Sequence, residues 1–205
     1  MGLSGPNDKE GEMSLNLRVN GDASFILSFT IVPGRVVQSK AAEVFLISRL
    51  QGAPGHFRQV RLATRTLHDV APDAMLLAAL QGMAMSYGIS ELVAVNSTNQ
   101  IYYSDAYASQ FKDAYDDFFA GLGFNQNAAG LYFSSIPIVE KPLERIKPGH
   151  KIRTREKRAF KKEIMLSCAE FFGKRTVSPG SLKKNAGAKL PGYPPAGVPS
   201  SLVTK

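Results

Sequence analysis

The sequence contains few of the residues from which disulfides, metal centres and membrane spans are built. Its single cysteine, Cys168, excludes an internal disulfide and fits a reducing compartment, so we expect the protein in the cytoplasm. The three histidines are scattered and cannot form a zinc site with one cysteine. No apolar run approaches the ~18 residues of a membrane span, and the polar beginning lacks the apolar segment of a secretory signal. These absences predict a soluble protein without a structural metal.

Motifs for catalysis and for phosphate binding are equally scarce. No G-x-S-x-G nucleophile motif is present. The turn QGAPG (51–55) is glycine-rich, but phosphate-binding loops lead directly into a helix. Here about fifteen residues, interpreted mainly as a strand, lie between the turn and the next helix. Asp113, Asp116 and Asp117 share one helical face and have the carboxylates for a divalent cation, but an acidic outer face of an amphipathic helix explains them better. The sequence therefore predicts no metal site.

The composition that is present belongs to one globular domain with a basic end. Apolar residues make up 44% of the 205 residues and charged residues 20%, which suits a chain with a real core. Residues 1–140 contain 9 Lys and Arg against 13 Asp and Glu, whereas residues 141–205 contain 16 against 4. We expect a flexible leader over 1–10, a single α/β domain over 11–172, and a disordered, basic, Pro- and Gly-rich tail over 173–205.

Apolar periodicity predicts the elements of the domain. We expect strands over residues 13–20, 23–32, 43–51, 57–66, 91–96 and 131–139, and helices over residues 72–87, 107–122 and 153–172. Asn20-Gly21 joins the first two strands as a hairpin. FRQVRLATRT (57–66) alternates with period two, so 43–66 is interpreted as a second hairpin, with Arg58, Arg61 and Arg65 on its polar or ligand-facing sides. A crossover through the helix at 72–87 places 91–96 beside an earlier strand.

This order predicts an α+β or mixed α/β fold, with a largely antiparallel twisted sheet and two or three packed helices. It is similar to the architecture of acyl-CoA N-acyltransferases, in which a strand-to-helix junction receives the cofactor pyrophosphate and a splayed pair of strands admits the pantetheine arm. On that architecture an acyl-CoA contacts Gln51, Gly52, Gly55, Arg61 and Arg65, and a proton moves through His68 or Tyr102. The alternative is a plain hairpin turn, with His68 as a polar connector.

The basic helix is the other candidate site. Arg153, Arg155, Lys157 and Arg158 can bind an anionic partner or a membrane surface. The run KIRTREKRAFKK (151–162) lacks the aromatic interleaving of single-strand binders, so nucleic acid ranks last among the partners considered. A solvated helix face is the alternative explanation.

Several short segments, in their order and spacing, resemble the VirK/YbjX family of Gram-negative bacterial proteins. The matching segments are SFILSFTIV (24–32), LISRLQG (46–52), ATRTLHDVAP (63–72), AYDDFF (114–119), KPLERI (141–146) and REKRAFKKE (155–163). Four differences from the family pattern stand out. The usual domain extends further at its N-terminus, and Gln100 lies near the place of a common histidine. The AYDDFF segment lacks the first acid and the tryptophan, and an insertion, KPGHKIRT (147–154), separates KPLERI from the basic helix.

The resemblance implies a biological role but no particular chemical reaction, because such proteins are associated with virulence, envelope integrity and resistance to antimicrobial peptides. The leading hypothesis is therefore a cytoplasmic accessory protein whose basic helix contacts an anionic partner. The alternative is an acyltransferase-like enzyme that uses an acyl-CoA or an acyl-carrier donor.

Overall fold

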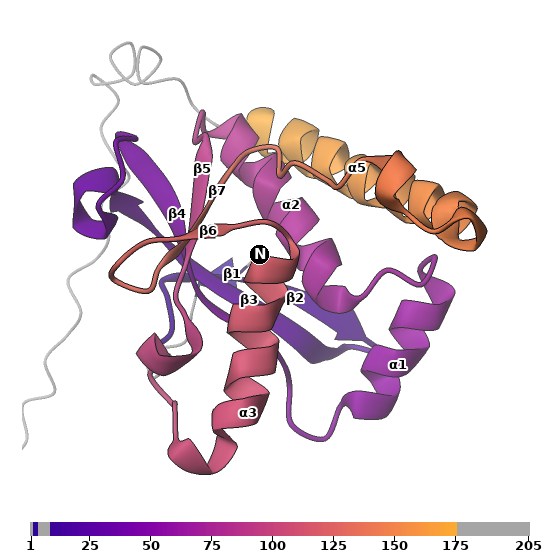
Figure 1. Cartoon of the computed structure of the whole chain (residues 1–205), viewed down its shortest axis with the longest axis horizontal. Helices are drawn as coiled ribbons and strands as arrows, with labels where there is room; N and C mark the ends of the chain where they lie inside the picture. The colour runs from indigo at the N-terminus through magenta and orange to yellow at the C-terminus, as the bar shows by residue number, and fades with distance from the viewer. Residues whose placement is uncertain (1, 4–8, 176–205) are drawn as a thin grey trace, which may run out of the picture. The chain divides into compact units, whose positions relative to one another are not determined.

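The structure is a computed structural model that describes residues 2–3 and 9–175, and its centre is one mixed sheet (Figure 1). The strands are β1 (Gly2–Leu3), β2 (Met13–Val19), β3 (Asp22–Pro33), β4 (Glu43–Gly52), β5 (Glu91–Ala94), β6 (Asn125–Gln126) and β7 (Tyr132–Ser135). They are arranged in the order β1-β2-β3-β4-β5-β7-β6. All neighbours are antiparallel except β4 and β5, which are parallel. The predicted tail lies almost wholly outside the described residues.

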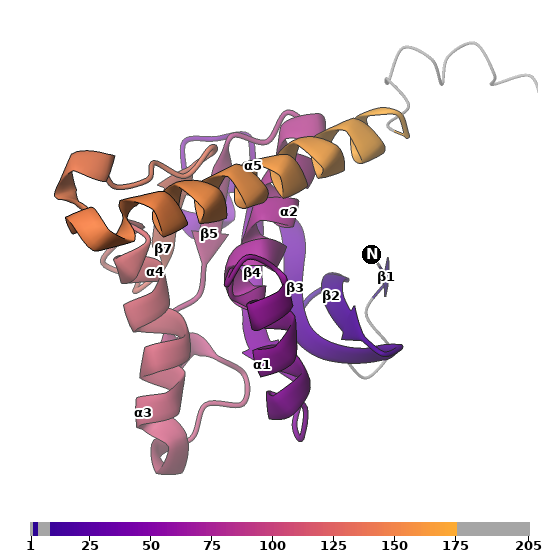
Figure 2. The same ribbon diagram turned by 90° about the vertical axis from the view of Figure 1, so that its right-hand side faces the viewer.

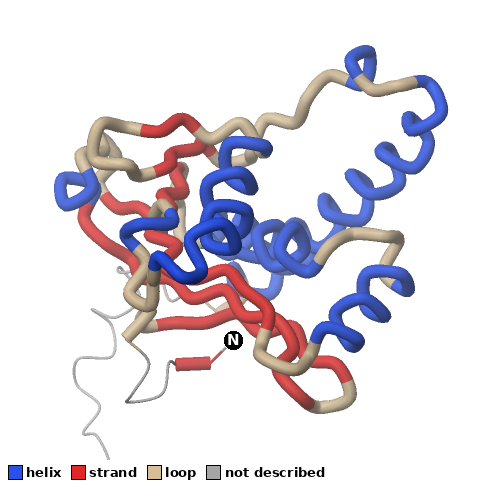
Figure 3. The backbone as a smooth tube through the Cα atoms, turned by 60° about the horizontal axis from the view of Figure 1, so that its bottom comes forward, coloured by secondary structure: helices blue, strands red, loops and turns tan. Residues whose placement is uncertain are grey.

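The helices gather mainly on one face of this sheet (Figure 3). The main ones are α1 (Phe57–Thr66), α2 (Pro72–Ser86), α3 (Ala108–Phe111), α4 (Phe118–Gly121) and α5 (Lys151–Gly173). A π-helical segment, η4 (Lys112–Asp117), joins α3 to α4. Short 3₁₀ turns are η1 (Gly34–Val37), η2 (Ser97–Asn99), η3 (Asp105–Tyr107), η5 (Leu143–Arg145) and η6 (Pro148–His150). The mixed α+β class and the largely antiparallel sheet are thus confirmed.

Several elements form for the reasons that the sequence indicated. Asn20 and Gly21 both have positive φ, 53° and 91°, as a two-residue turn between right-twisted strands requires. β4 lies between β3 and β5, and the chain crosses over through α1 and α2 to place β5 parallel to it. The helix predicted at 72–87 is α2, and Gly88 follows it with φ 72°.

The strand predicted at 57–66 is wrong, because this segment is the helix α1. In ten residues a period of two and a period of 3.6 are hard to distinguish, and the helical spacing of Val60, Ala63 and Leu67 is the one that the fold uses. Ala63 is buried, whereas Arg58, Arg61 and Arg65 are exposed at helical spacing. The turn at 51–55 therefore leads directly into a helix, and the hairpin 43–66 does not exist.

Three other segments differ from the prediction. The strand expected at 91–96 is β5, which ends at Ala94. The strand expected at 131–139 is shorter, since β7 ends at Ser135 and a cis Ile136–Pro137 bond follows. The helix expected at 107–122 is present but contains the π-helical segment η4. Proline cannot donate to a sheet ladder, so a strand that ends before Pro137 is physically reasonable.

The core lies between the sheet and α2. Leu27, Phe29 and Phe45 of the sheet meet Leu80 and Met83 of α2, and none of these side chains is exposed. In turn α5 packs across α2 (Figure 2). The two helices approach closely at Gly82, where an added Cβ atom would lie 2.0 Å from the Met165 carbonyl oxygen.

Candidate functional site

The candidate site lies where β4 and β5 separate. The two strands pair only from Phe45 to Ile47 and from Leu92 to Ala94, and one further bond joins the Val95 N–H to the Ile47 carbonyl at 3.1 Å. Beyond that point β4 continues to Gly52, paired with β3 alone among the described strands. Figure 2 shows β5 and β4 leading to different sides of the fold, toward α3 and toward α1. The final residues of β4 thus keep one free edge.

Tyr115 of η4 reaches this free edge. Its hydroxyl oxygen accepts a hydrogen bond from the Leu50 N–H at 3.3 Å, and its side chain is 1% exposed. Burial raises the pKa of Tyr115 to about 12, with a smaller contribution from the Glu10 carboxylate, while the bond from Leu50 opposes the shift. The hydroxyl therefore stays protonated above the pH at which an ordinary tyrosine ionises.

An ion pair between Arg49 of β4 and the buried Glu10 lies beside Tyr115. An Arg49 nitrogen is 2.7 Å from a Glu10 carboxylate oxygen, and the Glu10 side chain is only 4% exposed. With its amide turned to satisfy its neighbours, Gln51 accepts from Arg49 at 3.0 and 3.1 Å. Gln51, expected to bind a cofactor, thus holds the Arg49 guanidinium.

Asp116 fixes the loop that follows β5. Its carboxylate accepts from the Ser97 N–H at 3.1 Å and from the Ser97 hydroxyl. The acidic outer face predicted for this helix is thus only partly correct. Asp116 faces the loop at Ser97, whereas Asp113 and Asp117 are exposed. Asp117 pairs with Lys112 at 2.6 Å. Within residues 2–3 and 9–175 there is no group of three or more metal-ligating side chains.

The turn after β4 is held against β3. The Ala53 N–H donates to the Ser24 carbonyl at 3.0 Å, and His56 Nδ1 lies 3.4 Å from the Ser24 hydroxyl. Gly52 ends β4, and Gly55 has φ 79°, a conformation that favours glycine. α1 begins immediately after His56, so the turn delivers the N-terminus of α1 to the carboxyl end of β4.

The first turn of α1 suits an anion. The N–H groups of Phe57, Arg58 and Gln59 precede the first helical bond, which joins the Val60 N–H to the His56 carbonyl at 3.0 Å. No acidic side chain lies in this turn, and Arg58 adds a positive charge to the positive end of the helix dipole. Arg61 and Arg65 continue the exposed basic face.

The two residues expected to transfer a proton lie in separate parts of the fold. His68 is exposed, has φ 53°, and its ring lies 4.9 Å from the Phe160 ring of α5. Tyr102 lies between η2 and η3 and is 60% exposed. No hydrogen bond or ring contact joins them among the described residues.

The basic helix α5 is partly neutralised by the chain itself. Arg153 pairs with Asp69 at 2.8 Å, and Arg158 pairs with Glu140 and donates to the Lys141 carbonyl. Arg155 is exposed and Lys157 half-buried, and neither has an ion pair with a described residue. Two of the four predicted anion-binding side chains are therefore engaged.

Sequence reasoning did not identify Tyr115 as part of the candidate site, because its spacing also fits the aromatic residues by which its helix packs into the core. It also missed Glu10, which falls in the polar leader. The pairing of Glu10 with Arg49 joins residues far apart in the chain, and no local pattern contains that information.

Comparison with known proteins places the chain in a family. Residues 2–165 match the family described as "Protein of unknown function (DUF535)". No curated protein and no solved structure matches the chain. In the described part of the chain, none of the helices combines the length and hydropathy needed to cross a membrane. Because the match covers most of its residues, the chain belongs to DUF535, which is the VirK/YbjX family that its sequence resembles.

Proposed function

We propose that the chain is an acyltransferase-like protein that binds an acyl-CoA, with the phosphates at the start of α1 and the acyl end where β4 and β5 separate. The observation that carries the proposal is that the turn at 51–55 leads directly into α1. The sequence argued against a phosphate site because a predicted strand separated the glycines of this turn from the next helix. In the fold that segment is α1 itself, so the separation does not exist.

The start of α1 supports the phosphate end of the proposal. Free N–H groups at a helix N-terminus bind phosphates through the hydrogen bonds and through the dipole. Arg58, Arg61 and Arg65 add positive charge on the exposed side of the same helix.

The free edge of β4 supports the acyl end. An acyl-CoA supplies a thioester whose C–S bond breaks when an acceptor bonds to the carbonyl carbon, and the sulfur leaves as a thiol. Tyr115 accepts from the Leu50 N–H and thereby fixes this edge of β4, while its 1% exposed side chain keeps the hydroxyl away from a bound ligand. We therefore assign Tyr115 a positioning role at the acyl end. His68 contacts α5, and Tyr102 lies in the loop between η2 and η3.

Thermal unfolding of the full chain with acetyl-CoA and with palmitoyl-CoA tests this proposal. A ligand at ~100 times its dissociation constant that binds only the native state adds roughly 2.7 kcal/mol of stability. The double variant Arg61→Gln/Arg65→Gln should lose most of the shift, whereas Arg35→Gln, an exposed arginine of η1, should keep it. A cooperative transition that neither ligand moves would contradict the proposal.

A second function concerns α5, and it is favoured by Arg155, which is exposed and has no ion pair with a described residue. Here the chain is a cytoplasmic accessory protein, linked to envelope integrity, antimicrobial-peptide resistance or virulence, that contacts an anionic partner or membrane surface through α5. Because Arg153 and Arg158 are already in ion pairs, Arg155 and Lys157 should dominate the contact. Co-sedimentation with phosphatidylglycerol vesicles should fall in Arg155→Gln/Lys157→Gln and stay unchanged in Arg18→Gln, an exposed arginine of β2. If the Arg155→Gln/Lys157→Gln variant sediments with the vesicles as fully as Arg18→Gln does, this role is excluded.

A further inference from the structure

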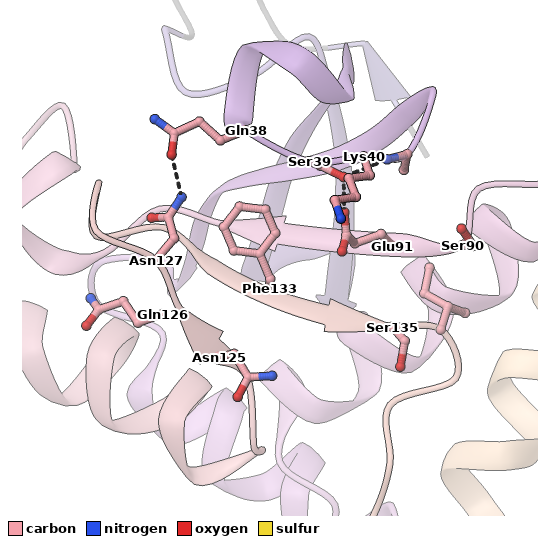
Figure 4. A pocket seen from close by; sticks show the side chains of 12 residues that line it. Gln38, Ser39, Lys40, Ser90, Glu91, Asn125, Gln126, Asn127, Phe133 and Ser135 are labelled. Carbon is pink, nitrogen blue, oxygen red and sulfur yellow. Dashed lines mark hydrogen bonds between the residues drawn. The ribbon is translucent and has the colours of Figure 1, made fainter.

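A polar pocket lies at the other end of the parallel strands, away from the proposed acyl-CoA site. It has a volume of about 800 Å³ and is formed by the segment after η1, the start of β5 and the β6–β7 hairpin (Figure 4). Val93 and Phe133 of this region pack with Val37 and Val44, whereas Leu92 and Tyr132 belong to the core under α2. The pocket therefore opens on the sheet face opposite α2.

Most of the twelve side chains that line this pocket can form hydrogen bonds. Four are carboxamides and three are hydroxyls, and the carboxylate of Glu91, the ammonium group of Lys40, the ring of Phe133 and two aliphatic side chains complete the lining; the carboxamides are Gln38, Asn125, Gln126 and Asn127. A carboxamide both donates and accepts hydrogen bonds without carrying charge. Such a lining suits a ligand that is itself rich in neutral groups that donate and accept.

The Phe133 ring supplies an apolar surface within this polar lining. Phe133 is half-buried, and Figure 4 shows its ring between Asn127 on one side and Glu91 with Ser39 on the other. Asn125 is its register partner on β6, so both side chains belong to the same face of the sheet. The ring is thus flanked by hydrogen-bonding groups on both sides.

Two of the polar groups are fixed in place before any ligand binds. The Asn127 amide oxygen accepts from the N–H groups of Ala129 and Leu131 at 3.0 and 2.9 Å, and the Asn127 amide nitrogen donates to the Gln38 oxygen at 3.4 Å. The Ser39 hydroxyl donates to Glu91. Fixed groups lose little conformational entropy on binding, which favours recognition of a small ligand.

We propose that this pocket binds a carbohydrate, with the apolar face of a sugar ring against Phe133 and its hydroxyls on the carboxamides and Glu91. Sugar hydroxyls donate and accept, as the four carboxamides do. A phosphate ligand would need more than one cation, and Lys40 shares the pocket with the Glu91 carboxylate. Glu91 is the single acid of the lining, whereas glycoside hydrolysis ordinarily uses two, so the inference concerns binding and not cleavage.

Saturation-transfer NMR on the full chain tests the proposal. The probes are glucose, galactose, mannose and N-acetylglucosamine, and their short homo-oligosaccharides. At least one should receive magnetisation from the protein. Phe133→Leu, which keeps an apolar side chain but removes the ring, and Asn125→Ala should each weaken that ligand by about tenfold. The matched control Gln110→Ala, an exposed carboxamide of α3, should leave the affinity unchanged.

The thermal unfolding of each variant shows whether it folds, and Asn125→Ala is an exposed change that should not alter folding. Transfer to no sugar of the panel would overturn the proposal, as would a sugar whose affinity both variants leave unchanged. Acyl-CoA binding, measured on the same samples, should be unaffected by either variant. The sugar proposal and the acyl-CoA proposal can therefore fail independently.

Discussion

Replacing Tyr115 by phenylalanine removes one hydroxyl from the free edge of β4 and leaves the aromatic ring in the core. The Leu50 N–H then loses its partner in a buried position. An unsatisfied buried donor costs roughly 1–3 kcal/mol, and because the bond is long we expect about 1 kcal/mol at neutral pH. Tyr115→Phe should therefore be modestly less stable than the natural chain at pH 8.

The sign of this effect should reverse at high pH. Tyr115 has a pKa of about 12 in the folded chain against the ordinary value of 10.0. The unfolded chain therefore ionises first, so the natural protein loses stability as the pH rises from the ordinary value through the folded pKa. Because the folded and unfolded pKa values differ by about 2, the loss reaches roughly 2.7 kcal/mol once the pH exceeds both. The phenylalanine variant has no such loss, so the two stabilities should cross near pH 11.

Urea unfolding followed by circular dichroism at pH 8, 10 and 11 measures this crossing. The chain contains seven tyrosines and no tryptophan, so tyrosinate absorbance gives a second readout. The difference between the titration curves of the natural chain and the variant should show one tyrosine titrating near pH 12. A difference curve centred near the ordinary pKa, or a stability difference that stays constant with pH, would refute the buried hydrogen-bonded position of Tyr115.

Three further changes test the packing around the site. Gly82→Ala should destabilise the chain by about 2 kcal/mol or more, since the added Cβ atom would meet the backbone of α5. Thermal unfolding measures this, and an unchanged midpoint would contradict the close approach of α2 and α5. Arg49→Met should cost roughly 3 kcal/mol because it removes a partner of the buried Glu10 carboxylate, and adding Glu10→Gln should restore part of it in urea unfolding. A double-mutant cycle on Asp69 and Arg153, which are both well exposed, should give a coupling below about 1 kcal/mol, and a larger coupling would mean that α5 is held mainly by charge.

Local signals predicted much of the fold. The hairpin turn at Asn20-Gly21 could be predicted directly, because a two-residue turn requires positive φ at both positions and these residues adopt it readily. α2 could be read because its apolar residues recur over fifteen positions between Pro72 and Gly88. The central place of β4 followed from its apolar sequence.

The segments that were misassigned are short or depend on distant partners. The ten residues of α1 fit two periods, and the fold selects the helix that buries Ala63. This error mattered for function, because it separated the glycine turn from its helix. The Leu50–Tyr115 and Glu10–Arg49 contacts join distant residues, so the candidate site could be recognised only from the folded chain.

The central claim is that the junction of β4 with α1 binds an acyl-CoA, and amide chemical shifts of the ¹⁵N-labelled full chain test it most directly. On titration with acetyl-CoA, the claim predicts saturable shifts of the Gly55, Phe57, Arg58 and Gln59 amides and of Leu50, which Tyr115 holds. Shifts confined to α5, or no saturable shifts at the start of α1, would contradict it.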